Sequence, residues 1–175
     1  MIVILLQKMS LKKSGIKNKT MIKYIRKGDI FKIPGVYSYA HGCNCAGAMG
    51  KGIALQFKNR FPLMYKKYKS LCIKGDFMPG DVYDYSYELG HIYNLATQKS
   101  WRSKAQMEYI KSSLNKMMEL AIYNKTTTIA LPAIGAGLGG LDWNEIKCEL
   151  NKISLKYPTV NLIVVEKWEP MTQIR

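Results

Sequence analysis

Short apolar runs alternate along the chain with stretches in which apolar residues recur at helical spacing. Six runs, each rich in β-branched, aromatic or other apolar residues and each close to a turn, predict strands at residues 22–26, 36–40, 82–87, 92–96, 128–131 and 160–165. Helical spacing of three or four positions begins at Ile53, Met107 and Trp143. Because helices that separate strands imply crossover connections, the pattern predicts an α/β protein with parallel strands.

The third helical stretch carries a start signal. Asp142 precedes it and Glu145 stands three positions later, so each side chain can reach the other's backbone amide, as in a capping box. This spacing favours a helix cap over a catalytic acid for Asp142. The elements together predict a three-layer α/β/α sandwich around a mixed central sheet of about six strands.

The length and charge of the chain indicate its organisation. At 175 residues it is in the range of a single domain. Residues 1–20 hold five lysines and no acid, and we interpret them as a basic N-terminal extension to a domain that spans residues 21–175. The net charge of +15 favours anionic partners and leaves nucleic acid open as one of them. No known nucleic-acid recognition motif of aromatic and basic residues is present, and a solvated basic surface is the simpler interpretation.

The sequence also bears on location. No apolar run approaches the roughly 20 residues that cross a bilayer, and the run that follows Met1 lacks the flanks of a signal peptide. The four cysteines are too few for a secreted disulfide framework, so we expect reduced thiols. These features predict a cytoplasmic protein with no membrane partner.

Two glycine-rich loops carry the strongest chemical signal. The first spans residues 41–53 and the second residues 134–141, and each stands between a predicted strand and a predicted helix. Glycine allows a positive φ and a close approach to a ligand, while amides at a helix N-terminus point toward an anion. Two such loops at strand ends can hold a diphosphate from both sides. Tight turns without a ligand are the alternative, because neither loop matches a Walker motif or the full dinucleotide-binding pattern.

Four ordered motifs give these loops a family resemblance. They stand at residues 27–30 (KGDI), 40–45 (AHGCNC), 49–54 (MGKGIA) and 131–143 (LPAIGAGLGGLDW). In this order they resemble the macrodomain family, in the branch that contains ADP-ribose 1''-phosphate phosphatase, terminal ADP-ribose protein glycohydrolase and an antitoxin that removes ADP-ribose from DNA. The resemblance covers most of the chain, from Ile22 to Pro170.

The resemblance implies binding roles for particular residues. Asp29 accepts a hydrogen bond from the adenine amino group, with the Ile30 amide beside it, and Asn44 lies near the distal ribose. The two diphosphate-binding loops correspond to Gly50, Lys51, Gly52 and Ile53, and to Gly135, Ala136, Gly137, Leu138 and Gly139. The implied partner is ADP-ribose or a molecule that carries it, and no cofactor is implied.

The glycohydrolase members of this family use a lysine just after a strand and an aspartate in the second loop. Gln98 stands at the lysine position, with Lys99 one residue late, and Gly139 stands at the aspartate position. Glutamine cannot form a Schiff base and glycine offers no carboxylate, which disfavours that mechanism. Because a one-residue shift reverses the face of a side chain in a strand, Lys99 can substitute only if the strand ends early.

The phosphatase-like members share the segment around His41. A histidine with a pKa near neutrality can act as a general acid or base on a phosphate monoester, so His41 and Asn44 are the candidate catalytic residues. A buried histidine that fixes the loop is the equal alternative. His41, Cys43 and Cys45 alternate along a strand-to-loop segment, a spacing that does not favour a closed metal site, and we predict no metal.

The predicted function is that of an ADP-ribose-binding macrodomain that hydrolyses ADP-ribose 1''-phosphate or another ADP-ribose derivative. The alternatives are a non-catalytic reader of ADP-ribose and an ADP-ribosyl glycohydrolase that uses Lys99. Trp101 and Trp168 are candidates for stacking on the adenine or the distal ribose, with core packing as the alternative.

Overall fold

One mixed sheet forms the middle of the molecule. The computed structural model describes residues 21–170, so the predicted basic extension at residues 1–20 lies outside it. The six strands are β1 (Ile22–Gly28), β2 (Tyr39–Asn44), β3 (Val82–Tyr87), β4 (Gly90–Gln98), β5 (Thr128–Pro132) and β6 (Asn161–Trp168). They lie in the order β1-β6-β5-β2-β4-β3. β3 is antiparallel to β4, and every other neighbouring pair is parallel.

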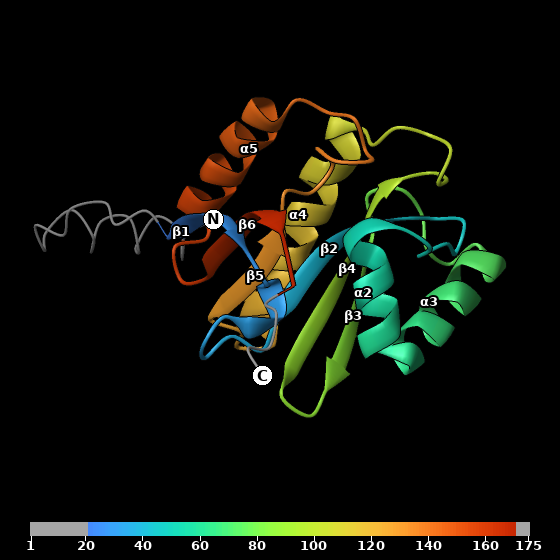
Figure 1. Ribbon diagram of the computed structural model, residues 1–175, viewed down its shortest axis with the longest axis horizontal. Helices are drawn as coiled ribbons and strands as arrows, with labels where there is room; N and C mark the ends of the chain where they lie inside the picture. The colour runs from blue at the N-terminus through green and yellow to red at the C-terminus, as the bar shows by residue number, and fades with distance from the viewer. Residues whose placement is uncertain (1–20, 171–175) are drawn as a thin grey trace, which may run out of the picture.

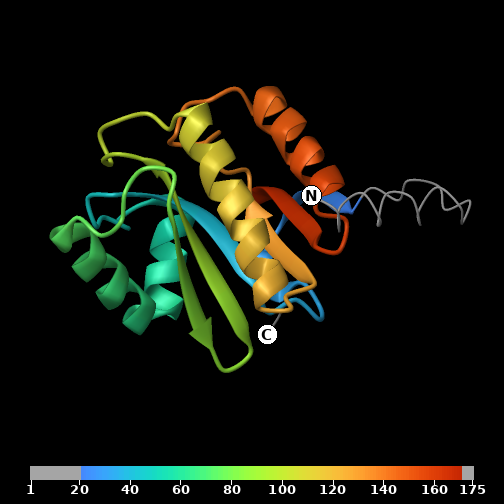
Figure 2. The same cartoon turned by 180° about the vertical axis from the view of Figure 1, so that it is seen from behind.

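Helices cover both faces of this sheet, which confirms the predicted three-layer sandwich. α2 (Gly52–Arg60) and α3 (Pro62–Lys74) lie on one face (Figure 1). α4 (Met107–Tyr123) and α5 (Trp143–Lys156) lie on the other (Figure 2). Within residues 21–170, no helix is both long and apolar enough to cross a membrane.

Each face of the sheet has its own apolar core. Leu114 of α4, Leu150 of α5 and Leu131 of β5 belong to the first core, and all three are fully buried. Phe57 of α2 and Tyr68 of α3 are fully buried in the second core on the opposite face. Since burial of one large apolar side chain contributes about 1.5–3 kcal/mol, both layers of helices stabilise the sheet.

The strand expected at residues 36–40 is displaced along the chain. β2 begins at Tyr39 and continues through Asn44, so it includes the first four residues of the predicted first loop. The reason is burial, because His41, Cys43 and Asn44 are buried and β2 pairs with β4 as far as Asn44. The loop itself starts at Cys45.

The sequence pattern did not predict α3. Apolar residues at Ile53, Phe57 and Phe61 indicated a single helix, but α2 ends at Arg60 and α3 begins at Pro62. Proline fits the first position of a helix because the amide that it lacks has no intrahelical partner there. The apolar face of α3 is narrow, and its buried residues are Met64 and Tyr68.

The carboxyl ends of parallel strands meet at one edge of a sheet. β5, β2 and β4 are consecutive neighbours, so the segments that follow Pro132, Asn44 and Gln98 emerge next to one another. In Figure 1 these segments and the start of α2 lie at the same edge. The two glycine-rich loops therefore meet there.

The cap of α5 provides a test of the local sequence signal. Asp142 Oδ1 accepts hydrogen bonds from the amides of Asn144 at 2.6 Å and Glu145 at 3.4 Å, which confirms the predicted cap. We expect Asp142→Ala to lower the free energy of unfolding by about 1 kcal/mol in urea denaturation, because two helix amides lose their acceptor. Asn144→Ala is the matched control, since that exposed residue uses only its backbone here. Equal losses in the two variants would contradict the capping role.

Candidate functional site

A cleft of about 680 Å³ opens at the carboxyl edge of the sheet. It is lined by the first glycine-rich loop with the start of α2, by the second glycine-rich loop, and by the end of β4 with the turn after it. The loops face each other closely, since a Cβ on Gly52 would lie 3.7 Å from Leu138 Cδ1. Small-molecule sites have volumes of about 300–1,000 Å³, so the cleft can enclose a nucleotide-sized ligand.

Asn44 shapes the first loop from inside. Its side-chain oxygen accepts hydrogen bonds from the amides of Ala46 at 3.0 Å and Ala48 at 3.2 Å, and its side-chain nitrogen donates to the Ala48 carbonyl at 2.7 Å. The Tyr68 hydroxyl donates to the Asn44 carbonyl at 2.6 Å. Asn44 also lines the cleft, as predicted, but its contacts within residues 21–170 make it a determinant of the loop's shape first.

The N-terminus of α2 points amides into the cleft. Its N-cap residue, Lys51, has extended backbone angles and makes no side-chain capping bond. Gly52, Ile53 and Ala54 line the cleft in the first turn, where helix amides have no intrahelical acceptor. Free amides combined with the helix dipole favour an anion at this position.

The second loop leaves further amides unpaired. Within residues 21–170, the amides of Gly135, Gly137, Leu138 and Gly139 donate to no protein acceptor, whereas the loop is closed by a bond from the Leu141 amide to the Gly135 carbonyl at 3.0 Å. Gly135 has a φ of +72°, which favours glycine there. The loop therefore presents a row of donors to the opposite wall of the cleft.

The electrostatics of the cleft favour an anionic ligand. Among residues 21–170, Lys51 is the only formally charged residue that lines it. Backbone donors and one lysine bind phosphate oxygens well, while the absence of a lining carboxylate removes the main source of repulsion.

His41 lies behind the cleft wall rather than in it. Its side chain is fully buried and its ring stacks on Phe57, with centroids 4.1 Å apart. Its Nε2 lies 2.8 Å from Asn94 Oδ1, while Asn94 Nδ2 donates to the carbonyls of Tyr83 and Ile92. Asn94 Oδ1 therefore accepts, and Nε2 carries the proton. The predicted catalytic role of His41 has no support in this position, which fits the alternative of a buried histidine that fixes the loop.

Burial also determines the protonation state of His41. It lowers the pKa of the imidazole to about 4, because the charged form would lose its hydration. Nδ1 is buried without a hydrogen-bond partner in the part of the chain that the structure describes. The ring is therefore neutral near pH 7.

Asp29 and Ile30 do not line the cleft, although the resemblance implied that they bind the ligand. Asp29 Oδ1 accepts from the Phe31 amide at 3.0 Å and from the Trp168 indole at 3.4 Å. Ile30 begins the 3-10 helix η1 (Ile30–Lys32), which contacts β5. Both residues thus stand at the same edge of the sheet, on the β1 side of the second loop.

Ala136 also lies off the cleft wall. Its amide donates to the Ala133 carbonyl at 3.3 Å, and its side chain packs against the core below α4 and α5. The other predicted members of the two loops line the cleft, namely Gly50, Lys51, Gly52, Ile53, Gly135, Gly137, Leu138 and Gly139.

Gln98, and not Lys99, faces the cleft at the end of β4. The strand continues through Gln98, whose side chain lines the cleft, while Lys99 is exposed and does not line it. The strand therefore does not end early, and Lys99 is not placed to substitute for the missing lysine. A Cβ on Gly139 would lie 2.5 Å from the Gly135 carbonyl oxygen, so this backbone has no room for an aspartate there.

Some lining residues were not predicted. Thr97 lies at the end of β4, and its hydroxyl donates to the Cys43 carbonyl at 3.4 Å. Met49 and Ala133 also line the cleft. The sequence feature that could have identified Thr97 is its position directly after the predicted strand at residues 92–96. Trp101, a predicted stacking candidate, lines the cleft and is 62% exposed.

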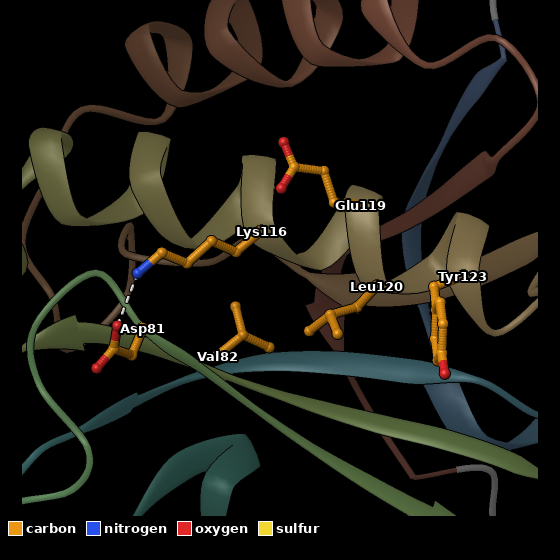
Figure 3. Close-up of a pocket in the computed structure, with 6 residues that line it drawn as sticks. All are labelled: Asp81, Val82, Lys116, Glu119, Leu120 and Tyr123. Atoms are coloured by element: carbon orange, nitrogen blue, oxygen red, sulfur yellow. Dashed lines mark hydrogen bonds and ion pairs between the residues drawn. The ribbon is translucent and has the colours of Figure 1, made fainter.

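A second hollow, of about 380 Å³, lies between β3 and α4 (Figure 3). An ion pair joins Asp81 and Lys116 across it at 2.7 Å. It has no glycine-rich loop and no helix N-terminus directed into it among its lining residues, which are Asp81, Val82, Lys116, Glu119, Leu120 and Tyr123. The cleft is therefore the stronger candidate for a functional site.

Comparisons with known proteins agree with this geometry. The family model of the macro domain matches residues 40–147. The chain is 36% identical over 131 residues to a DNA ADP-ribosyl glycohydrolase of Thermus aquaticus, covering 73% of this chain and 36% of that protein. It is 31% identical over 136 residues to ADP-ribose glycohydrolase OARD1 of Homo sapiens, covering 75% of this chain and 83% of that protein. The macrodomain of Mycobacterium tuberculosis DarG matches with a TM-score of 0.78 and 32% identity, covering 85% of this chain and 99% of that one.

The chain belongs to the macro domain family. It spans only 36% of the length of the Thermus aquaticus relative, so the likeness to that protein concerns one part of it.

The buried state of His41 predicts a pH dependence of stability. Its native pKa of about 4 lies below the usual value of 6.5, so the unfolded chain binds the proton more readily. Stability should be unaffected by this group above about pH 6.5 and should fall by up to about 3 kcal/mol as the pH drops to 4. In urea denaturation at several pH values from 7.5 to 4.5, the free energy of unfolding should fall less steeply with decreasing pH in His41→Asn than in the native chain. Identical slopes would contradict the burial of a neutral imidazole.

Proposed function

We propose that this chain binds ADP-ribose in the cleft and hydrolyses a derivative whose distal ribose carries a further group. The observation that carries the proposal is the pair of loops whose unpaired amides face each other across the cleft. A diphosphate needs many donors at short range, and these two rows of amides with the α2 dipole supply them.

The order of the strands suggests how the ligand lies. The second loop follows β5 and the first follows β2, so the diphosphate lies between them. Asp29 stands on the β1 side, and its two donors both bind Oδ1, which leaves Oδ2 as the acceptor that the proposal assigns to the adenine amino group. The distal ribose then lies toward Asn44 and Gln98, on the β4 side.

Gln98 is the side chain best placed to act near the distal ribose. Its Nε2 donates to the Ser100 carbonyl at 3.0 Å, which leaves Oε1 to accept from a ribose hydroxyl or an attacking water. No histidine or carboxylate among residues 21–170 lines the cleft, so hydrolysis relies on positioning, on the amides, and on the ligand's own phosphate oxygens as proton acceptors. The names of the relatives, which include glycohydrolases for ADP-ribose on DNA, support a hydrolase.

A non-catalytic reader of ADP-ribose is the second candidate. Two features favour it. No histidine or carboxylate among residues 21–170 lines the cleft, and the backbone at Gly139 has no room for the aspartate that the glycohydrolase members use. A cytoplasmic location belongs to the proposal in either form, and the four cysteines are all free thiols.

Binding is tested with substitutions at Gly137. This exposed residue lines the cleft and has no positive φ, and a Cβ added to it would meet nothing within 4 Å. We expect Gly137→Glu to weaken ADP-ribose binding at least about tenfold more than Gly137→Gln, because only the glutamate repels the diphosphate. Isothermal calorimetry gives both dissociation constants. Equal affinities in these two variants, which match in size, would place the diphosphate elsewhere.

Hydrolysis is tested with two substrates, ADP-ribose 1''-phosphate and a single-stranded oligodeoxynucleotide that carries ADP-ribose on one base. We expect release of phosphate or of ADP-ribose from at least one of them. Gln98→Ala should lower kcat about tenfold or more through the loss of its positioning oxygen, with less effect on ADP-ribose affinity. If neither substrate reacts while ADP-ribose binds, the protein is a reader.

A further inference from the structure

The strand at one end of the sheet has an open edge. β3 is last in the strand order, and β4 is its only neighbour among residues 21–170. The carbonyl of Asp81, the residue before β3, accepts from the Ala96 amide at 2.9 Å, so it faces β4. Because residues of an antiparallel strand bond alternately to one side and the other, the amides and carbonyls of Val82, Asp84 and Ser86 point away from the sheet. No backbone group elsewhere in residues 21–170 bonds to them.

β3 lacks the features that usually protect an edge strand. Its register with β4 runs without a bulge, and the strand contains neither lysine nor proline. Its one charged side chain, Asp84, already has partners, because it lies 2.8 Å from His91 Nδ1 and accepts from Asn124 Nδ2 at 2.6 Å. Since bulges, lysines and prolines are common means of preventing edge pairing, the edge of β3 is open to an added strand.

The hollow between β3 and α4 lies beside this edge. Figure 3 shows Val82 and Leu120 pointing toward each other between the strand and the helix, with Asp81 and Tyr123 toward the two ends. Val82 packs against the core on the α4 side of the sheet. Since side chains of a strand alternate between the two faces, every second side chain of an added strand points toward α4. Those side chains enter the hollow.

The charges around this edge favour a basic partner. Residues 76–90 contain no lysine, arginine or histidine, although the whole chain has a net charge of +15. Their acids are Asp76, Asp81, Asp84 and Glu88. Glu119 adds a carboxylate to the lining of the hollow, and Tyr123 adds an aromatic ring that is 84% exposed. A lysine or arginine suits this lining, because its stem packs on Val82 and Leu120 while its charge meets the carboxylate and the ring.

The other face of β3 favours apolar side chains. Tyr83 belongs to the second core, and Tyr85 and Tyr87 pack against it. Lys67 Nζ lies 6.0 Å from the centroid of the Tyr83 ring, so a positive charge on this face would be repelled. Pairs of aromatic and β-branched residues on neighbouring strands stabilise a sheet. A segment that alternates basic and β-branched residues therefore matches both faces.

We propose that the edge of β3 and the hollow beside it bind an extended segment of a partner protein, with lysine or arginine at alternate positions. The main chain of this segment continues the sheet by bonding to Val82, Asp84 and Ser86. Its basic side chains enter the hollow, and its apolar side chains cover the tyrosines of β3. None of the residues that line the hollow lines the ADP-ribose cleft, so this surface is independent of the proposed function.

Strand addition is tested with a short synthetic peptide in which lysine and valine alternate, added to the full chain. We expect a saturating amount to slow amide hydrogen exchange at Val82, Asp84 and Ser86 by at least about tenfold, as resolved by NMR. Exchange at Tyr83 and Tyr85 should stay within about twofold, because these amides already face β4. The same peptide with glutamate in place of lysine should have a Kd at least about tenfold higher in calorimetry.

A proline substitution separates the main-chain contacts from the side chain. Ser86 is exposed, and proline is tolerated on an edge strand where the lost amide faces solvent. Ser86→Pro should raise the Kd of the lysine peptide at least about tenfold, whereas Ser86→Ala, which keeps the amide, should leave it within about twofold. Glu119→Gln tests the charge without changing the strand, and it should raise the same Kd about threefold at low salt and less at high salt.

Four outcomes overturn the inference. Unchanged exchange at the three outward amides would exclude strand addition, and equal affinities for the lysine and glutamate peptides would exclude a basic partner. Equal effects of Ser86→Pro and Ser86→Ala would place the peptide away from the edge. Protection of the outward amides that rises with protein concentration, without peptide, would assign the edge to a second copy of this chain. Each outcome leaves ADP-ribose binding in the cleft untouched.

Discussion

The placement of β2 between β5 and β4 is the constraint on which the rest of the structure depends. All three strands are parallel, so the first loop, the second loop and the turn that holds Trp101 leave the sheet at one edge. The contacts of His41 with Asn94 and Phe57 keep β2 in this position by joining it to β4 and α2. Polar side chains buried in this way stabilise the fold only while every strong donor is paired.

The chemistry of the cleft belongs mainly to the backbone. Asn44 uses its side chain to shape the first loop, and the amides around Gly52 and Leu138 then remain free for a ligand. Apart from Lys51, such a site meets phosphate oxygens with backbone amides, so its binding step should vary little with pH near neutrality. Two of the lining side chains that can contact a substrate, Gln98 and Trp101, come from the end of β4 and the turn that follows it.

Much of this arrangement could be predicted from the sequence, because strong local signals agree with the fold. Five of the six strands, the two glycine-rich loops and the Asp142 cap follow from spacing and composition, whereas β2 begins three residues later than the pattern predicts. The burial of His41 could not, since it depends on Phe57, which joins it only in three dimensions. α3 escaped prediction because its apolar face is narrow and Pro62, which usually marks the end of a helix, begins one here. The outward position of Trp101 depends on a turn closed by serine contacts, which no periodicity reveals.

The most direct test of the central claim is amide hydrogen exchange with and without saturating ADP-ribose, resolved by residue with NMR. The amides of Gly52, Ile53, Ala54, Gly135, Gly137, Leu138 and Gly139 have no protein acceptor within residues 21–170, so they should exchange rapidly in the free protein. We predict that ADP-ribose slows exchange both at the amides that begin α2 and at the amides of the second loop. Binding of ADP-ribose that leaves either group unprotected would contradict a diphosphate held between the two loops.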